Sequence, residues 1–225
     1  MTEAAPGRTA GRALDQDRAR SFAFMLGGPR PGGASERLAR RAAEGLPPRA
    51  ERSWLSLGGL PLPGAEGFGP ASSAPAEDGR PGVAGHEKLL LDATLEHTDI
   101  VVVSPLYWYS VSAQAKLYLD YWARWMSSPE LCFRTRMGGK TLWAVSTFAR
   151  GQAHDAEPLV GMLRRTAGYL DMVWGGALLH QVRSTGEPAD PDTAHRATAF
   201  FGAAGPDIGG SAPLTGAHSA ERENR

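Results

Sequence analysis

Residues 99–122, DIVVVSPLYWYSVSAQAKLYLDYW, decide the fold class of this chain. The stretch opens with four consecutive apolar residues, Ile100 to Val103, which predict a strand over 99–104 that is buried on both faces. A helical pattern of apolar residues follows over 112–126. A strand covered on both faces and followed by a helix is the repeating unit of a parallel sheet.

The same alternation extends in both directions along the chain. We expect strands over 21–26, 52–57, 99–104, 140–146 and 172–182, and helices over 35–46, 86–97, 112–126, 156–170 and 191–201. Strict alternation predicts an α/β fold in which helices cover both faces of a parallel sheet. Five such strands indicate the flavodoxin-like arrangement, a five-stranded parallel sheet with strand order 2-1-3-4-5.

The two ends of the chain differ from this core. Residues 1–20 and 204–225 are rich in small and polar residues and lack apolar periodicity, so we expect flexible tails around a domain at 21–203. The first twenty residues contain no apolar signal core, and no apolar run in the chain is long enough to span a bilayer. We therefore expect a cytoplasmic protein with no membrane partner.

Charge and cysteine content narrow the functional classes. The 24 Lys and Arg residues equal the 24 Asp and Glu residues in number, which gives no basic footprint for nucleic acid. The balance also argues against a strongly acidic electron carrier that docks on basic partners. Cys132 is the only cysteine, so an internal disulfide and a thiolate metal or iron–sulfur site are excluded. We expect no metal site.

The loop after the first strand, GGPRPGGAS at 27–35, has the composition of a phosphate-binding turn. Gly28 and Gly33 allow the backbone to approach a ligand closely, and Ser35 is a favourable N-cap residue for the helix that follows. Free amides at a helix start attract anions, and Arg30 adds a guanidinium suited to phosphate. The alternative is an ordinary turn that carries a surface arginine. The spacing does not match the dinucleotide fingerprint G-x-G-x-x-G.

The loop after the third strand contains three consecutive aromatic residues, Tyr107, Trp108 and Tyr109, directly after Pro105. Loops at the edge of a sheet are normally polar, because they face water. A flat apolar ligand would explain the aromatics by covering them. The alternative is that they pack against a neighbouring loop or subunit.

The loop after the fourth strand, STFARG at 146–151, offers the hydroxyls of Ser146 and Thr147 and the ring of Phe148. The carboxyl ends of parallel strands meet at one edge of the sheet, so the three loops converge there. Together they supply an anion-binding end, an aromatic slot and hydrogen-bonding groups. This combination indicates flavin mononucleotide (FMN) more than a sugar or a nucleic acid.

These residues resemble those of the NAD(P)H-dependent FMN reductase and quinone reductase family of flavodoxin-like proteins. The likeness runs over about 21–203 and is most specific in 99–122. The family pattern is matched there by Pro105, Tyr107, Trp108, Ser110, Lys116 and Asp120. In the first loop Arg30 and Ser35 match, whereas Gly28 and Ala34 replace the family's usual serine and asparagine.

The resemblance implies FMN held non-covalently, with backbone amides of 106–111, beginning at Leu106, and of 146–151 around the ring. It implies that NAD(P)H is the co-substrate and that a quinone, free flavin or similar small molecule is the electron acceptor. It also implies a homodimer or higher homo-oligomer. For that contact the helix at 113–126 is a candidate, through Tyr118, Tyr121, Trp122 and Trp125; the alternative is that these four aromatics pack in the core.

Three functions follow from these observations. The first is an FMN-dependent oxidoreductase in which the side chains orient the flavin and none acts as a general acid or base. In such an oxidoreductase, Arg150 either lies near the incoming substrate or is a solvated charge on the loop. The second is a flavodoxin-type electron carrier. The third is a degenerate member that has lost flavin, in keeping with Gly28 and Ala34 at donor positions.

Overall fold

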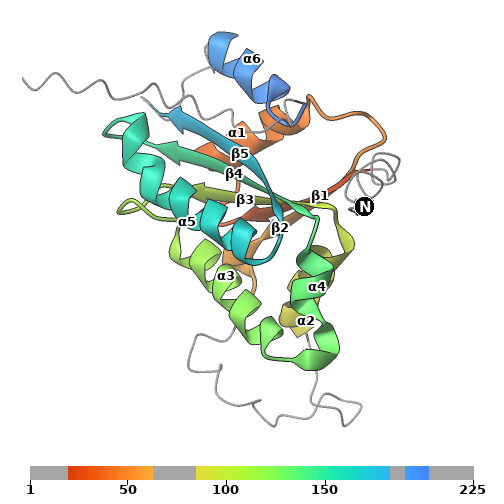
Figure 1. Cartoon of the computed structure of the whole chain (residues 1–225). Coiled ribbons are helices and arrows are strands. Elements are labelled where there is room, and N and C mark those ends of the chain that lie inside the picture. The colour runs from red at the N-terminus through yellow and green to blue at the C-terminus, as the bar shows by residue number, and fades with distance from the viewer. Residues whose placement is uncertain (1–19, 63–84, 183–190, 203–225) are drawn as a thin grey trace, which may run out of the picture.

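The computed structural model describes residues 20–62, 85–182 and 191–202 (Figure 1). The predicted tails, apart from Arg20, lie outside these residues. Most of residues 58–82, a stretch rich in Gly and Pro whose composition predicts a long loop, also lies outside them. Arg20 itself is held beside the first strand, where its guanidinium pairs with Asp99 at 2.5 Å. No helix within the described ranges is both long enough and apolar enough to cross a membrane.

The five strands form one parallel sheet in the order β2-β1-β3-β4-β5, so the predicted flavodoxin-like topology is confirmed. The strands are β1 (Ser21–Leu26), β2 (Glu51–Ser56), β3 (Asp99–Pro105), β4 (Thr141–Phe148) and β5 (Val173–Gln181). β4 runs two residues further than predicted. Thr147 and Phe148 are therefore strand residues, and their side chains point to opposite faces of the sheet.

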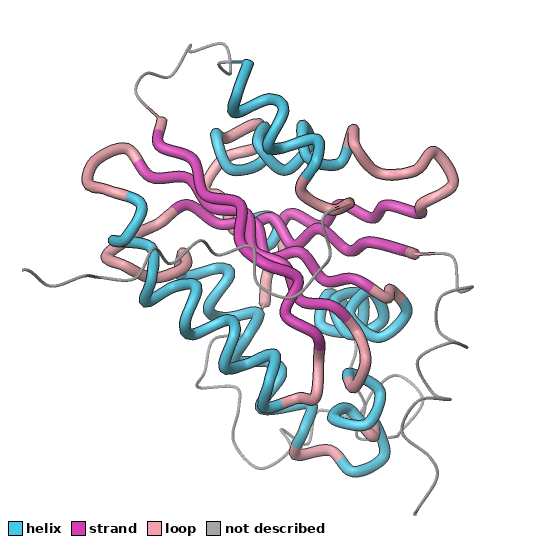
Figure 2. Tube along the Cα trace, turned by 45° about the horizontal axis from the view of Figure 1, so that its top comes forward, coloured by secondary structure: helices cyan, strands magenta, loops and turns pink. Residues whose placement is uncertain are grey.

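Helices cover both faces of the sheet, as predicted (Figures 1 and 2). One face packs against α1 (Ala34–Ala43) and α6 (Pro191–Ala199), and the other against α2 (Gly85–Glu96), α3 (Ala113–Met126), α4 (Phe133–Met137) and α5 (Glu157–Tyr169). Among the described residues, short 3-10 turns lie at Leu57–Gly59, Pro129–Leu131 and Ala153–Ala156. Neither these turns nor α4 was predicted, because segments of three to five residues carry no periodicity.

The central strand shows why a continuous apolar run forms a strand here. Successive side chains of a strand point to opposite faces. Ile100 and Val102 therefore join the core beneath α2–α5, whereas Val101 and Val103 join the core beneath α1 and α6. All four are at most 1% exposed.

The aromatic residues of α3 belong to the core. Tyr118, Tyr121, Trp122 and Trp125 are between 0% and 2% exposed within a single chain. The Tyr118 hydroxyl shares a 2.7 Å hydrogen bond with Thr94, and burial raises the pKa of this phenol. The prediction that these four side chains contact a partner subunit is therefore wrong, and the alternative of core packing is confirmed.

The end of β1, the end of β3 and the start of α3 are pinned together at Gly27. Its amide donates to Val103 O at 2.7 Å, and its carbonyl accepts from Ser112 Oγ at 2.6 Å. A Cβ at Gly27 would lie 2.8 Å from Ala115 Cβ and from Ser112 Oγ, so only glycine fits. This contact fixes the positions from which the first and third loops leave the sheet.

Candidate functional site

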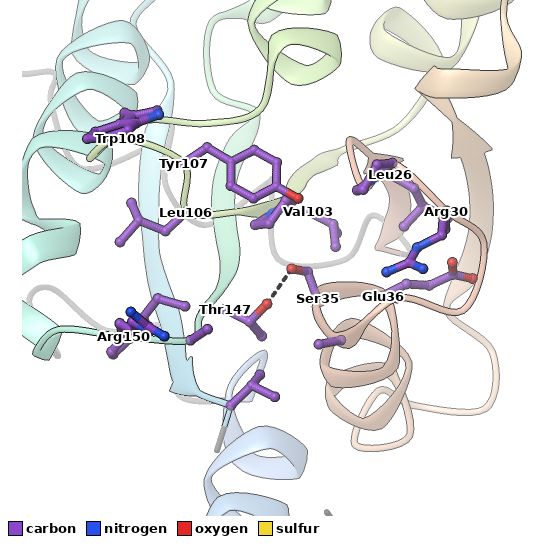
Figure 3. A pocket seen from close by; sticks show the side chains of 18 of the residues that line it. Leu26, Arg30, Ser35, Glu36, Val103, Leu106, Tyr107, Trp108, Thr147 and Arg150 are labelled. Atoms are coloured by element: carbon purple, nitrogen blue, oxygen red, sulfur yellow. Dashed lines mark hydrogen bonds between the residues drawn. The ribbon is translucent and has the colours of Figure 1, made fainter. Parts of the chain in front are cut away.

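A cavity of about 720 Å³ lies at the carboxyl edge of the sheet, where the loops after β1, β3 and β4 converge (Figure 3). Eleven of the predicted site residues line it: Gly28, Arg30, Gly33, Ser35, Pro105, Leu106, Tyr107, Trp108, Tyr109, Thr147 and Phe148. The cavity therefore lies at the edge of the sheet that the strand-edge rule indicates.

Two predicted residues, Ser110 and Ser146, do not line this cavity. Because β4 continues to Phe148, Ser146 obeys strand alternation and shares the face of Ala144, which packs beneath α2–α5. Its hydroxyl is buried and has no hydrogen-bond partner among the described residues. Ser110 instead closes the turn of the third loop through its backbone.

The start of α1 differs from the prediction that Ser35 caps it. The N-cap residue is Gly33, in an extended conformation and without a side-chain cap, and the helix begins at Ala34. Ser35 lies inside the first turn, and its hydroxyl shares a 2.7 Å hydrogen bond with that of Thr147 (Figure 3). Both residues are 5% exposed. Ser35 therefore connects the first loop to β4.

The first turn of α1 forms the anion-binding end of the cavity. The amides of Ala34, Ser35 and Glu36 belong to this turn, where an α-helix offers no internal acceptor. The helix dipole adds partial positive charge at the same place. Arg30 lies beside it and lines the cavity (Figure 3), and no ion pair of Arg30 forms within the described part of the chain.

Three side chains of α1 hold the first loop in shape. Gly32 has φ +69°, a left-handed conformation that favours glycine. Its amide donates to Glu36 Oε2 at 2.8 Å, and its carbonyl accepts from Arg37 Nη1 at 2.7 Å. Glu36 in turn accepts from Arg40 at 2.9 and 2.6 Å. Partial burial opposes the charge of Glu36, but these hydrogen bonds and the Arg40 charge outweigh it, so the pKa of Glu36 lies below its usual value.

The aromatic loop is a tight, strained turn. Tyr107 and Ser110 exchange backbone hydrogen bonds of 2.9 and 3.0 Å, so the two residues between them must turn the chain. Trp108 and Tyr109 do so with φ of +48° and +65°, which costs about 1–2 kcal/mol for each residue that is not glycine. Trp108 is 92% exposed.

Exposed aromatics in a strained turn are typical of a ligand-binding surface. Tyr107 and Tyr109 are about half exposed, and the Tyr107 ring extends across the cavity toward Leu26 (Figure 3). The amide of Leu106 donates to Thr147 O at 2.9 Å, which joins this turn to β4. No other segment packs over Trp108 within the described residues. The alternative that the aromatics pack against a neighbouring loop therefore does not apply to Trp108.

The loop after β4 forms the far side of the cavity. Arg150 lines it opposite Arg30 (Figure 3). Gly151 has φ +92°, and a Cβ there would lie 2.2 Å from Asp155 Oδ2. Asp155 and Gln152 form a capping box, with Gln152 N donating to Asp155 Oδ2 at 2.8 Å. Arg150 is thus carried by a turn whose shape is fixed by its neighbours.

Sequence reasoning missed the two carboxylates that line the cavity, Glu36 and Asp155. Each accepts a hydrogen bond from a nearby backbone amide, Gly32 N for Glu36 and Gln152 N for Asp155, and no sequence motif predicts this role. Even so, the cavity fits FMN. Its volume is within the range of cofactor sites. One end presents amide donors and Arg30, and the other end presents aromatic rings.

The sheet order and the position of the cavity define a flavodoxin-like protein. The sequence matches the NADPH-dependent FMN reductase family over residues 21–177, and the chain belongs to that family. It is therefore an NAD(P)H-dependent FMN oxidoreductase, with FMN as cofactor and NAD(P)H as co-substrate. The predicted family, enzyme class and cofactors are confirmed.

Individual relatives are distant. The chain is 22% identical over 173 residues to the "Putative NAD(P)H-dependent FMN-containing oxidoreductase YwqN" of Bacillus subtilis strain 168, a match that covers 74% of this chain and 87% of YwqN. Among solved structures, the Trp repressor binding protein from Bacillus subtilis superposes with a TM-score of 0.59 at 19% identity, covering 80% of this chain and 97% of that one. FerB, a flavoenzyme NAD(P)H:(acceptor) oxidoreductase from Paracoccus denitrificans, superposes with a TM-score of 0.54 at 17% identity, covering 82% and 94%. At these identities the solved structures support the fold alone.

Proposed function

We propose that this chain binds FMN with its phosphate at the start of α1 and its ring against the 105–110 turn, and reduces a quinone, free flavin or similar small acceptor. One observation carries the proposal: a single cavity joins a helix start with free amides to an exposed, strained aromatic turn. When bound, FMN supplies the redox chemistry, accepting hydride from NAD(P)H and passing electrons on.

The residues divide the work of binding along the cavity. Arg30 and the first-turn amides of α1 bind the phosphate. Tyr107 and the backbone of 105–110 support the ring, while Thr147, held by Ser35 at 2.7 Å, keeps the middle of the cavity at a fixed width. Phe148 closes the inner wall, because it is only 7% exposed.

The outer part of the site is suited to a small planar acceptor. Trp108 and Tyr109 are exposed at the cavity mouth, and Arg150 lies on the opposite side. A planar acceptor gains stacking area there and then leaves by the same opening. The zero formal charge of the chain favours such an acceptor over a docked protein partner, since protein electron carriers rely on complementary charge. A homo-oligomer and a cytoplasmic location stay predictions, and the aromatics of α3 cannot form the subunit contact.

The test is the absorption spectrum of the purified full-length protein, followed by NADH and NADPH titrations. We expect flavin bands, bleaching by a nicotinamide, and steady nicotinamide consumption when a quinone is added without any carrier protein. A protein that binds FMN but shows no such turnover contradicts the reductase proposal and favours an electron carrier. A protein that binds no flavin contradicts the site itself.

A further inference from the structure

We infer that Glu36 lowers the preference of the flavin site for a phosphorylated flavin, so that the site also accepts flavins without the 5′-phosphate, such as riboflavin. This inference rests on the proposed function, because it concerns the phosphate end of the same cavity. It assigns a specificity role to a carboxylate that lines the cavity and that neither the motif nor the fold requires.

Glu36 lines the cavity and is held in place by the first loop and by α1. Its Oε2 accepts from the amide of Gly32 at 2.8 Å, in the loop that surrounds the anion-binding end. Its side chain is 13% exposed and is held by Arg40 Nη2 at 2.6 Å, so it is not free to swing away. The Arg40 guanidinium also lies 4.3 Å from the centre of the Trp54 ring, which stacks on Phe24 at 4.0 Å. A chain of contacts from β1 and β2 therefore fixes this carboxylate in place.

The charge of Glu36 works against a second anion. Hydrogen bonds from Gly32 and Arg40 hold its pKa low, so it is ionised at neutral pH. Arg40 is committed to Glu36, and Arg37 donates to Gly32 O. Arg30 and Glu36 are thus the charged groups that line the cavity at this end, whereas Arg40, the ion-pair partner of Glu36, does not line it. A phosphate dianion must share the first turn of α1 with a fixed carboxylate, whereas riboflavin meets no such repulsion.

The test compares FMN and riboflavin affinities of the apo-protein by flavin fluorescence quenching. Glu36→Gln removes the charge and keeps an acceptor for Gly32. We expect FMN to bind about fivefold more tightly than to the wild type, and riboflavin to bind within about twofold of it. Glu36→Ala also removes the charge, so the ratio of FMN affinity to riboflavin affinity should rise there as well. Glu44→Gln is the matched control, because Glu44 pairs with Arg41 on the same helix and does not line the cavity; it leaves the ratio unchanged.

Several outcomes would contradict the inference. If both Glu36 variants bind FMN more weakly relative to riboflavin, or if neither folds, Glu36 is a scaffold for the loop and the inference is wrong. A ratio that does not change also overturns it. If the wild-type protein binds neither flavin, the proposed function fails first, and the same titration shows this before any variant is made.

Discussion

Polar and charged groups are arranged differently at the two ends of the parallel sheet. At the amino end of the strands, buried polar groups are paired: Asp99 is 2% exposed and accepts from Arg20, from Trp143 Nε1 at 2.8 Å and from Thr98 Oγ1 at 2.7 Å. Lys140 at this end donates to the carbonyl of Leu95 at 2.9 Å. Asp99 and Lys140 thus each have protein partners.

At the carboxyl end, the same sheet carries strain and uncommitted groups. Trp108 and Tyr109 hold left-handed backbone conformations, and Trp108 is almost fully exposed. Arg30 and Arg150 face the cavity. The difference teaches that stability is concentrated at one edge and ligand binding at the other, so substitutions at the two edges should separate cleanly into losses of stability and losses of affinity.

The largest effect is expected at the amino end. Asp99→Ala removes one partner of a buried charge network and leaves Trp143 without an acceptor, which should lower the free energy of unfolding by about 3–5 kcal/mol. Urea unfolding measures it. Asp92→Ala, at the exposed pair with Lys88 on α2, is the control and should cost no more than about 0.5 kcal/mol. A loss of similar size in both variants would show that the buried network contributes no more than an exposed ion pair.

At the carboxyl end, Arg30→Ala should weaken FMN binding about 10- to 100-fold, because a charged hydrogen-bond donor to the phosphate is lost. Its free energy of unfolding should stay near that of the wild type. Calorimetric titration with FMN and with riboflavin measures the change, and riboflavin affinity should fall far less. Arg41→Ala removes an exposed charge of α1 that does not line the cavity, and it should leave both affinities intact. Equal losses for both flavins in Arg30→Ala would rule out a phosphate contact.

A third substitution should trade function for stability. Trp108→Gly relieves a left-handed conformation and should stabilise the apo-protein by up to about 1 kcal/mol, while lowering kcat/KM for a quinone. Thermal unfolding and steady-state kinetics measure the two effects. Trp108→Phe keeps both the ring and the strain, so it should change neither strongly. If Trp108→Gly destabilises the protein, the turn is held by packing and not strained.

The smallest effect concerns pH. Because the pKa of Glu36 is lower in the folded chain, the unfolded state binds more protons between the two pKa values. The stability contributed by this carboxylate is therefore present at neutral pH and is lost as the pH falls through its folded-state pKa. Wild type and Glu36→Gln should differ by less than about 1 kcal/mol at neutral pH, and their stabilities should converge at a pH below the folded-state pKa of Glu36. Urea unfolding at both pH values tests this, and a difference that persists in acid contradicts it.

The sequence predicted the sheet, its order and the edge that holds the cavity, because alternation of buried strands and amphipathic helices leaves few topologies. It could not predict the ends of elements. Serine is a preferred N-cap residue, but the Ser35 hydroxyl hydrogen-bonds to Thr147 from inside the first turn, and Gly33 is the N-cap residue. Ser146 lies within β4, and strand alternation points its side chain to the face of the sheet that packs beneath α2–α5. Glu36 was missed because a carboxylate beside an anion site follows no sequence rule.

The exposed turn also gives this protein an intrinsic fluorescence probe, Trp108. Of its six tryptophans, Trp122, Trp125 and Trp143 are at most 2% exposed and Trp54 and Trp174 are partly covered, whereas Trp108 is 92% exposed. An indole in water emits at longer wavelength than one in a core and is open to collisional quenchers. Any molecule that covers the turn shields that one indole, so the red edge of the emission reports directly on what sits at the cavity mouth.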